Sequence, residues 1–273
     1  MQTTESKVVL FADLLGFAAL TEAHLVDLNL IKASDRPLAG NIETLLASQD
    51  NPLTRTFTCF HRSLKATIEL AQMQHPLTAI TFSDSAFIAT PHFFQAVNVA
   101  VDFLKYLLPQ RIPVRIGIAY GSFAAVRFRS DIMLDGGDHA AHFLGTGVVR
   151  SHATESCGIK GLRILLHPSV EQLLNDTVHN PQRSNRDQIR YVECSEEERN
   201  NTVGVRYEID YWRFKSTAEA DAWRALQNMW DTAPQIAVKH YQATAEAINR
   251  MRVGHGEPPL NNLRRRTLPR SDA

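Results

Sequence analysis

Short runs of apolar, β-branched residues alternate along this 273-residue chain with longer segments in which apolar residues recur every three or four positions. The first pattern predicts buried strands and the second predicts helices. Because neighbouring strand patterns follow one another directly within the alternation, we predict an antiparallel-rich α/β (α+β) sandwich of the ferredoxin-like type. Strands are expected at 7–12, 77–82, 86–89, 113–121, 123–128, 162–166 and 203–212, with 123–128 as the hairpin partner of 113–121. Helices are expected at 17–31, 55–74, 93–108, 148–156 and 216–251, the last interrupted at Pro234.

The charge of the chain excludes some classes of partner. It carries 29 basic and 29 acidic side chains, so no net positive field favours nucleic acid. No apolar run approaches the roughly 20 residues of a membrane span, and residues 1–6 lack the pattern of a signal peptide. Cys59, Cys157 and Cys194 form no CxxC pair and are interpreted as packing thiols. We expect a cytoplasmic protein that binds neither nucleic acid nor membrane.

Composition and periodicity also predict how the chain is organised. Residues 1–214 are expected to form the main domain, and 215–255 a C-terminal helical extension that packs on the core or braces a second subunit. Residues 256–273, which are rich in proline and arginine, are expected to form a disordered tail.

Two aspartates are the best candidates for chemistry. Asp13 ends the first apolar strand, and Asp84 lies in the turn of the hairpin predicted at 77–89. If the two strands are neighbours, the carboxylates converge and repel each other. A divalent cation relieves such repulsion, and oxygen ligands suit Mg²⁺ or Mn²⁺.

Four motifs in order resemble those of class III nucleotidyl cyclases. Residues 11–17, Phe-Ala-Asp-Leu-Leu-Gly-Phe, are similar to the first-strand motif of the family, and 81–85, Thr-Phe-Ser-Asp-Ser, resemble its second motif but lack the usual glycine before the aspartate. Residues 114–121 resemble its arginine-containing strand, and 145–156 match the glycine, valine and glutamate of its helix motif. The resemblance covers residues 7–170 and implies the class III cyclase catalytic core.

The resemblance implies a homodimer with active sites at the interface, which converts a nucleoside triphosphate to a 3′,5′-cyclic monophosphate and pyrophosphate. Two Mn²⁺ or Mg²⁺ ions would be held by Asp13, Asp84 and the backbone carbonyl of Leu14, and would activate the ribose 3′-hydroxyl.

Other positions are implied to contact the substrate. The turn Leu15, Gly16 and Phe17, at the start of a helix, would offer backbone N–H groups to phosphate oxygens. Arg115 stands where the family has a phosphate-contacting arginine.

The helix motif departs from the family. The transition-state asparagine and arginine of the family fall on Val149 and Ala153. Arg150, three residues before Ala153 and on the same helix face, is our candidate for the missing guanidinium. The alternative is a catalytically inactive cyclase homologue that binds nucleotide or serves as a scaffold.

The positions that read the purine in the family also differ, being Ile80 and His142 here. Loss of both polar readers predicts that neither ATP nor GTP is preferred. The pattern resembles the pyrimidine cyclases of Pycsar anti-phage systems, whose cyclic product activates a separate effector. We expect UTP, in preference to CTP, with an adenylate cyclase as a further alternative. Base-pocket candidates left open are Thr54, Arg55, Thr56 and Ser83.

Overall fold

A single sheet organises the structure, which is a computed structural model that describes residues 5–25, 51–129, 138–174, 190–213, 216–261 and 263. The strand order is β2-β3-β1-β4-β6-β8-β7, with β5 paired to β4 outside this path. Among the described strands only β4 and β6 pair in parallel. The strands are β1 Glu5–Leu14, β2 Thr78–Thr81, β3 Ser85–Thr90, β4 Val114–Arg129, β5 Asp138–Leu144, β6 Ile164–Leu166, β7 Tyr191–Glu193 and β8 Tyr207–Ile209.

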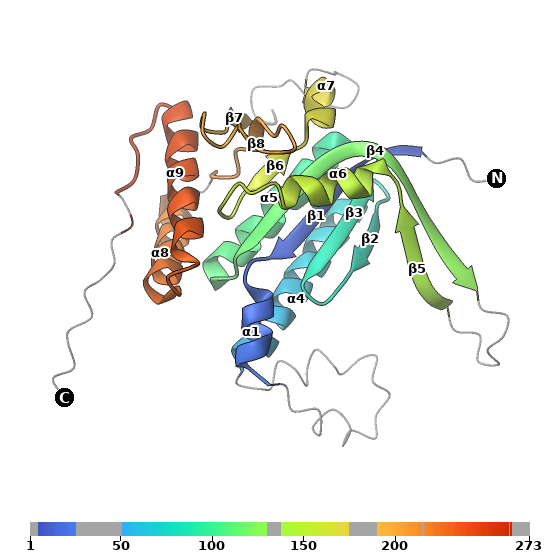
Figure 1. Cartoon of the computed structure of the whole chain (residues 1–273), viewed down its shortest axis with the longest axis horizontal. Helices are drawn as coiled ribbons and strands as arrows, with labels where there is room; N and C mark the ends of the chain where they lie inside the picture. The colour runs from blue at the N-terminus through green and yellow to red at the C-terminus, as the bar shows by residue number, and fades with distance from the viewer. Residues whose placement is uncertain are drawn as a thin grey trace.

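Helices flank the sheet, which confirms the predicted fold class (Figure 1). The order of β2, β3, β1 and β4, with helical connections after β1 and after β3, is the ferredoxin-like arrangement. The helices are α1 Phe17–Ala23, α4 Pro52–Gln72, α5 Phe93–Leu107, η2 Leu108–Gln110, α6 Thr146–Glu155, η3 Pro168–Val170, α7 Glu171–Leu174, α8 Ser216–Thr232 and α9 Val238–Gly254.

The two faces of β1 are buried in different clusters. Val8, Leu10, Ala12 and Leu14 belong to the main core, together with side chains of α4 and α5. Val9 and Phe11 belong to a smaller cluster with Phe87, Phe123 and others. Because side chains alternate across a strand, Asp13 lies on the side of the smaller cluster.

One predicted strand pair is wrong. Residues 123–128 do not turn back on 114–121 but continue the same strand, so that β4 runs from Val114 to Arg129. The reason is that both neighbours of β4 extend along it: β1 pairs with residues as far as Phe123, and β5 pairs with Ala124–Arg129. The β4–β5 pair projects beyond the rest of the sheet (Figure 1).

The C-terminal helices are continuous with the main core. Leu226 of α8 and Ile248 and Met251 of α9 are fully buried in the same cluster as Leu10 of β1. The break predicted at Pro234 is confirmed, because α8 ends at Thr232 and α9 begins at Val238.

A buried ion-pair network also joins these helices to the sheet. Arg163, next to β6, donates to both oxygens of the buried Glu208 of β8, and its Nη1 lies 2.7 Å from Oε1 of Glu198. Arg250 of α9 donates to the same Glu198 at 2.9 Å. Because burial of an unpaired charge costs several kcal/mol, each member of the network depends on the others.

Within the described ranges, no helix is long and apolar enough to cross a bilayer. Most of the tail predicted at 256–273 lies outside the described residues.

We predict that Leu226→Ala lowers the free energy of unfolding by roughly 2–5 kcal/mol, because it leaves a cavity in the core that α8 shares with the sheet. Urea unfolding followed by circular dichroism measures this change. The matched control is Ile236→Ala, since Ile236 is 80% exposed and its truncation should cost little. Equal effects of the two substitutions would contradict the shared core.

Candidate active site

Asp13 is positioned by the hydrogen-bonding of the sheet. It lies near the end of β1 between two antiparallel neighbours, with Ser85 of β3 opposite it on one side and Arg115 of β4 on the other. Opposed residues of an antiparallel pair share a face, so the guanidinium of Arg115 lies on the same side as the Asp13 carboxylate.

Asp84 is brought to the same end of the sheet by the β2–β3 turn. Its carbonyl accepts a hydrogen bond from the N–H of Leu14 at 2.9 Å, which ties the turn to the residue after Asp13. Its carboxylate accepts from the hydroxyl of Ser83 at 3.1 Å. His61 of α4 lies 3.2 Å from the carbonyl of Ser83 through its Nε2. The predicted convergence of the two strand ends is therefore observed.

Helix α6 adds a third carboxylate. It packs directly on Gly117 of β4, where an added Cβ would collide with the carbonyl oxygen of Ser151. This close approach is possible only for glycine, and it brings Glu155 against Arg115. The Nε of Arg115 donates to Oε1 of Glu155 at 2.7 Å, and its Nη1 donates to the carbonyl of Ile159 at 3.0 Å.

The electrostatics of the cluster are dominated by negative charge. Partial burial, followed by repulsion from Glu155 and Asp84, raises the pKa of Asp13 to about 7, against a smaller lowering by Arg115. Three carboxylates thus share one guanidinium, and that guanidinium is already paired. The cluster has the excess negative charge that a bound cation neutralises.

Two aspartates with nearby backbone carbonyls are a donor set that fits Mg²⁺ or Mn²⁺. Within the described ranges, no group of three or more His, Cys, Asp or Glu side chains is arranged to hold a metal ion. A site here therefore relies on Asp13 and Asp84, completed by carbonyl, water or substrate oxygens. The predicted contribution of the Leu14 carbonyl remains a prediction.

The backbone N–H groups of the turn after β1, which were predicted to bind phosphate, are partly used in hydrogen bonds within the protein. The N–H of Leu15 donates to the carbonyl of Pro113 at 3.0 Å, whereas the N–H groups of Gly16 and Phe17 meet no acceptor among the described residues. Gly16 has φ of 81°, a conformation that favours glycine. Helix α1 has only seven residues, so its N-terminus by itself contributes little to phosphate binding. The predicted phosphate contacts of the three residues remain predictions.

Residues of α6 point in different directions. The side chain of Val149 is 69% exposed. Arg150 donates through Nη1 to the carbonyl of Tyr120 at 2.9 Å and contacts no acidic side chain of the described ranges. His152 packs against Phe11, with ring centroids 5.1 Å apart. The side chain of Arg150 therefore lies against β4, and its contact with a substrate phosphate remains a prediction.

The two predicted base-reading positions lie on strands. Ile80 of β2 packs against the smaller cluster, which contains Phe87 and Phe11. The backbone of His142 pairs with Val126 on the β4–β5 arm, and its side chain is outside the part of the chain that is described.

The four base-pocket candidates divide between two places. Ser83 lies in the β2–β3 turn beside Asp84. Thr54 is buried in the first turn of α4, and Arg55 and Thr56 line a cavity at the same end of that helix. These three residues belong to the helix that packs on the main core, whereas Asp13 lies on the side of the smaller cluster.

Two supporting residues were not predicted as part of the site. Glu155 was predicted only as a helix position, because nothing in the local sequence reveals that it meets Arg115 forty residues earlier. His61 was not predicted, since only the packing of α4 on the β2–β3 turn gives it a role.

Comparisons with known proteins find structural similarity only. No protein-family model and no curated protein sequence matches this chain. Among solved structures, a bacterial light-regulated adenylyl cyclase has 12% identity, covers 82% of this chain and 100% of its own, and has a TM-score of 0.48. The guanylate cyclase domain of RhGC from Catenaria anguillulae, in complex with GTP, has 16% identity, coverage of 77% and 98%, and a TM-score of 0.47. The adenylyl cyclase CyaB from P. aeruginosa has 16% identity, coverage of 76% and 96%, and a TM-score of 0.44. Such similarity does not by itself carry an activity from one protein to another.

The raised pKa of Asp13 predicts a pH dependence of stability. An aspartate titrates near 3.8 in the unfolded chain and near 7 here, so the folded protein binds more protons between these values. The stability of the metal-free protein should therefore fall as pH rises from about 4 to about 7. After allowance for solvent screening, we expect a fall of about 1–2 kcal/mol from this group.

Urea unfolding at several pH values, in EDTA, measures the effect. Asp13→Asn should remove this part of the dependence of the unfolding free energy on pH. Glu5→Gln, at an exposed position of the same strand, should keep it. An Asp13→Asn protein with the same slope as the wild type would contradict the assignment.

Proposed function

We propose that this protein is a nucleotidyl cyclase that converts a pyrimidine nucleoside triphosphate, UTP in preference to CTP, to its 3′,5′-cyclic monophosphate and pyrophosphate. The observation that carries the proposal is the convergence of Asp13 and Asp84. The Leu14 N–H to Asp84 carbonyl hydrogen bond joins their two strand ends, and the Asp84 charge helps to raise the pKa of Asp13.

In this reaction Asp13 and Asp84 would hold two divalent cations. When bound, such ions lower the pKa of the ribose 3′-hydroxyl and offset the charge of the triphosphate. The contribution of this chain is to bind and orient. Asp13, whose pKa is raised to about 7, would be held in its ionised form as a ligand. The ion pair between Arg115 and Glu155 holds both side chains in place next to Asp13.

Positive charge for the transferring phosphoryl group must come from elsewhere, since Arg115 is neutralised by Glu155. Arg150 is our candidate, because its hydrogen bond to the Tyr120 carbonyl occupies one of its five donors. The remaining donors are available to a phosphate oxygen, which is the role that Ala153 cannot fill.

A homodimer is proposed from an apolar surface on the side of the sheet that carries Asp13. Phe82, Leu144 and Val149 are exposed there or at its rim, and the rings of Phe82 and Phe143 lie 5.9 Å apart. Large apolar side chains exposed on one side of a sheet are candidates for such an interface. A second protomer placed on this surface would cover the carboxylates and exclude water from them.

The pyrimidine preference is supported by Ile80. Its apolar side chain lies in the strand that leads to Asp84 and packs among aromatic residues, so it offers no hydrogen bond with which to select a purine edge. Following the resemblance to Pycsar cyclases, we propose that the cyclic product acts in anti-phage defence by activating a separate effector.

A second function is supported by the exposed Val149. Helix α6 has Val149 and Ala153 where the resembled family has polar side chains. Such a helix is consistent with a scaffold protein that binds nucleotide but does not convert it. The two proposals differ in whether product forms.

The test is incubation of the purified protein with Mn²⁺ and each of ATP, GTP, CTP and UTP, with cyclic products resolved by chromatography. We expect cyclic UMP, with less cyclic CMP. Asp13→Asn and Asp84→Asn should each lower the rate by about 100-fold or more, because loss of a direct ligand exceeds the roughly 10–100-fold cost of an outer-shell change. Glu69→Gln, an exposed acid on α4, is the control.

Cyclic AMP as the main product would contradict the pyrimidine assignment. Absence of any product would favour the scaffold.

The dimer is tested by Val149→Glu, which places a charge on the apolar surface and should yield a monomer with greatly reduced activity. Light scattering measures the mass. Leu70→Glu is the matched control, because Leu70 is 54% exposed on α4, on the other side of the sheet. A dimer that survives Val149→Glu but not Leu70→Glu would place the interface elsewhere.

A further inference from the structure

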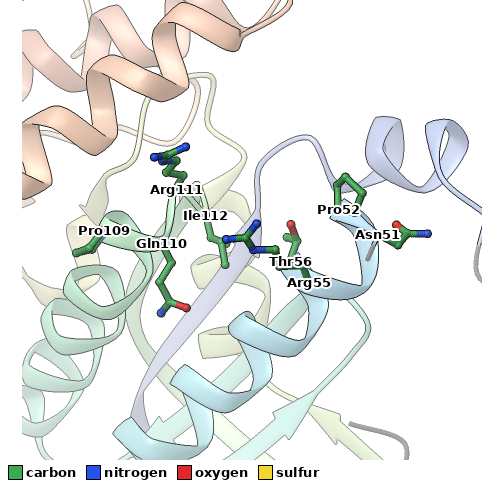
Figure 2. A pocket seen from close by; sticks show the side chains of 8 residues that line it. All are labelled: Asn51, Pro52, Arg55, Thr56, Pro109, Gln110, Arg111 and Ile112. Carbon is green, nitrogen blue, oxygen red and sulfur yellow. The ribbon is translucent and has the colours of Figure 1, made fainter. Parts of the chain in front are cut away.

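A cavity lies between the start of α4 and the turn that leads into β4. It has a volume of about 380 Å³ and is lined by residues of two stretches, 51–56 and 109–112. Figure 2 shows Arg55 extending from α4 toward Ile112, with Arg111 of the second stretch lying beyond Ile112. The volume is within the range of sites that hold small molecules.

The lining is positive. Among the described residues it contains Arg55 and Arg111 and no acidic side chain. Within the described part of the chain, neither guanidinium has a hydrogen bond or an ion pair. The side-chain amides of Asn51 and Gln110 are already used: Asn51 bonds Leu53 and Leu25, and Gln110 bonds Tyr106 and Ser63. The groups left to meet a ligand are therefore chiefly the two guanidiniums.

Arg111 is held in an unusual conformation. Its φ is 64°, and it is the one residue other than glycine with a positive φ among those described. This region is sparsely populated by residues with a side chain. The turn is fixed by hydrogen bonds from Arg111 N–H to the Leu108 carbonyl and from Ile112 N–H to the Leu107 carbonyl. These two hydrogen bonds form the Schellman motif that commonly ends a helix with a left-handed residue, so the turn presents the Arg111 side chain from a fixed backbone.

We propose that this cavity binds the phosphate group of a small phosphorylated ligand between Arg55 and Arg111. A guanidinium presents paired N–H donors that match the oxygens of a phosphate, and such charge-assisted hydrogen bonds are about twice as strong as neutral ones. A concave wall whose described residues include two unpaired guanidiniums and no carboxylate favours this chemistry over that of a cation or a neutral ligand.

The site is separate from the carboxylate cluster. The Asp13 side chain lies on the side of the smaller cluster, whereas α4 packs on the opposite side of the sheet. The charged groups that shift the pKa of Asp13 are Glu155, Asp84 and Arg115, and neither cavity arginine is among them.

The site is nevertheless connected to that cluster through the backbone. Pro113 follows the cavity wall directly, and its carbonyl accepts the N–H of Leu15, two residues after Asp13. A ligand bound to residues 109–112 would therefore act on the support of the strand end that carries Asp13. The existence of this binding site does not depend on the proposed reaction.

Isothermal titration calorimetry with sodium pyrophosphate, in EDTA, tests the proposal. The wild type should bind pyrophosphate, and Arg55→Ala and Arg111→Gly should each weaken the binding about 10-fold or more. Glycine accepts the backbone conformation at 111, so the second variant removes the side chain without disturbing the turn. Lys65→Ala removes a positive charge from an exposed position of α4 outside the cavity and should bind as the wild type does.

Asp13→Asn should also keep the binding, which distinguishes this cavity from the carboxylate cluster. No binding by the wild type, or equal binding by the Arg55→Ala, Arg111→Gly double variant, would overturn the proposal. Equal affinity for citrate would overturn the assignment to phosphate. Binding of uridine at the cavity would show a nucleoside site instead, and would overturn it as well.

Discussion

The pairing of β1 between β3 and β4 determines where the chemistry of this protein can occur. The two ladders fix Asp13 opposite Ser85 and Arg115, and one further hydrogen bond, from Leu14 to the Asp84 carbonyl, fixes the hairpin turn beside it. A slip of the register by one residue would move Asp13 into the main core and Leu14 to the other face. The buried alternation of Val8 to Leu14 against α4 and α5 prevents such a slip.

The rest of the site follows from this arrangement. Gly117 of β4, which pairs with Phe11 of β1, admits α6 and with it Glu155, which pairs with Arg115. The cluster then holds three carboxylates and a single guanidinium, and the pKa of Asp13 rises. Like charges held this close oppose folding unless a cation joins them, so the arrangement is better suited to function than to stability.

The sequence predicts the elements of the fold well where local pattern and tertiary contacts agree. The β2–β3 hairpin around Asp84 and the break between α8 and α9 are examples, since turn residues and proline act locally. The continuous β4 was not predicted, because its length depends on pairing with β1 and β5, which the local pattern does not contain.

The same distinction applies to side chains. The Asp13–Asp84 pair is predictable because each residue ends or joins a strand pattern. The partners of Arg115 and Arg163 are not, since Glu155 and Glu208 lie forty or more residues away in sequence and meet them only in the fold. The cavity at Arg55 and Arg111 likewise depends on two stretches that the chain brings together.

The central claim is that Asp13 and Asp84 form one cation site. Electron paramagnetic resonance measures it directly, because free Mn²⁺ gives a strong solution spectrum that is lost when the ion binds. The account predicts that the wild type binds Mn²⁺ and that Asp13→Asn and Asp84→Asn each weaken the binding about 10-fold or more. Mn²⁺ binding that is equal in the wild type and both variants would contradict it.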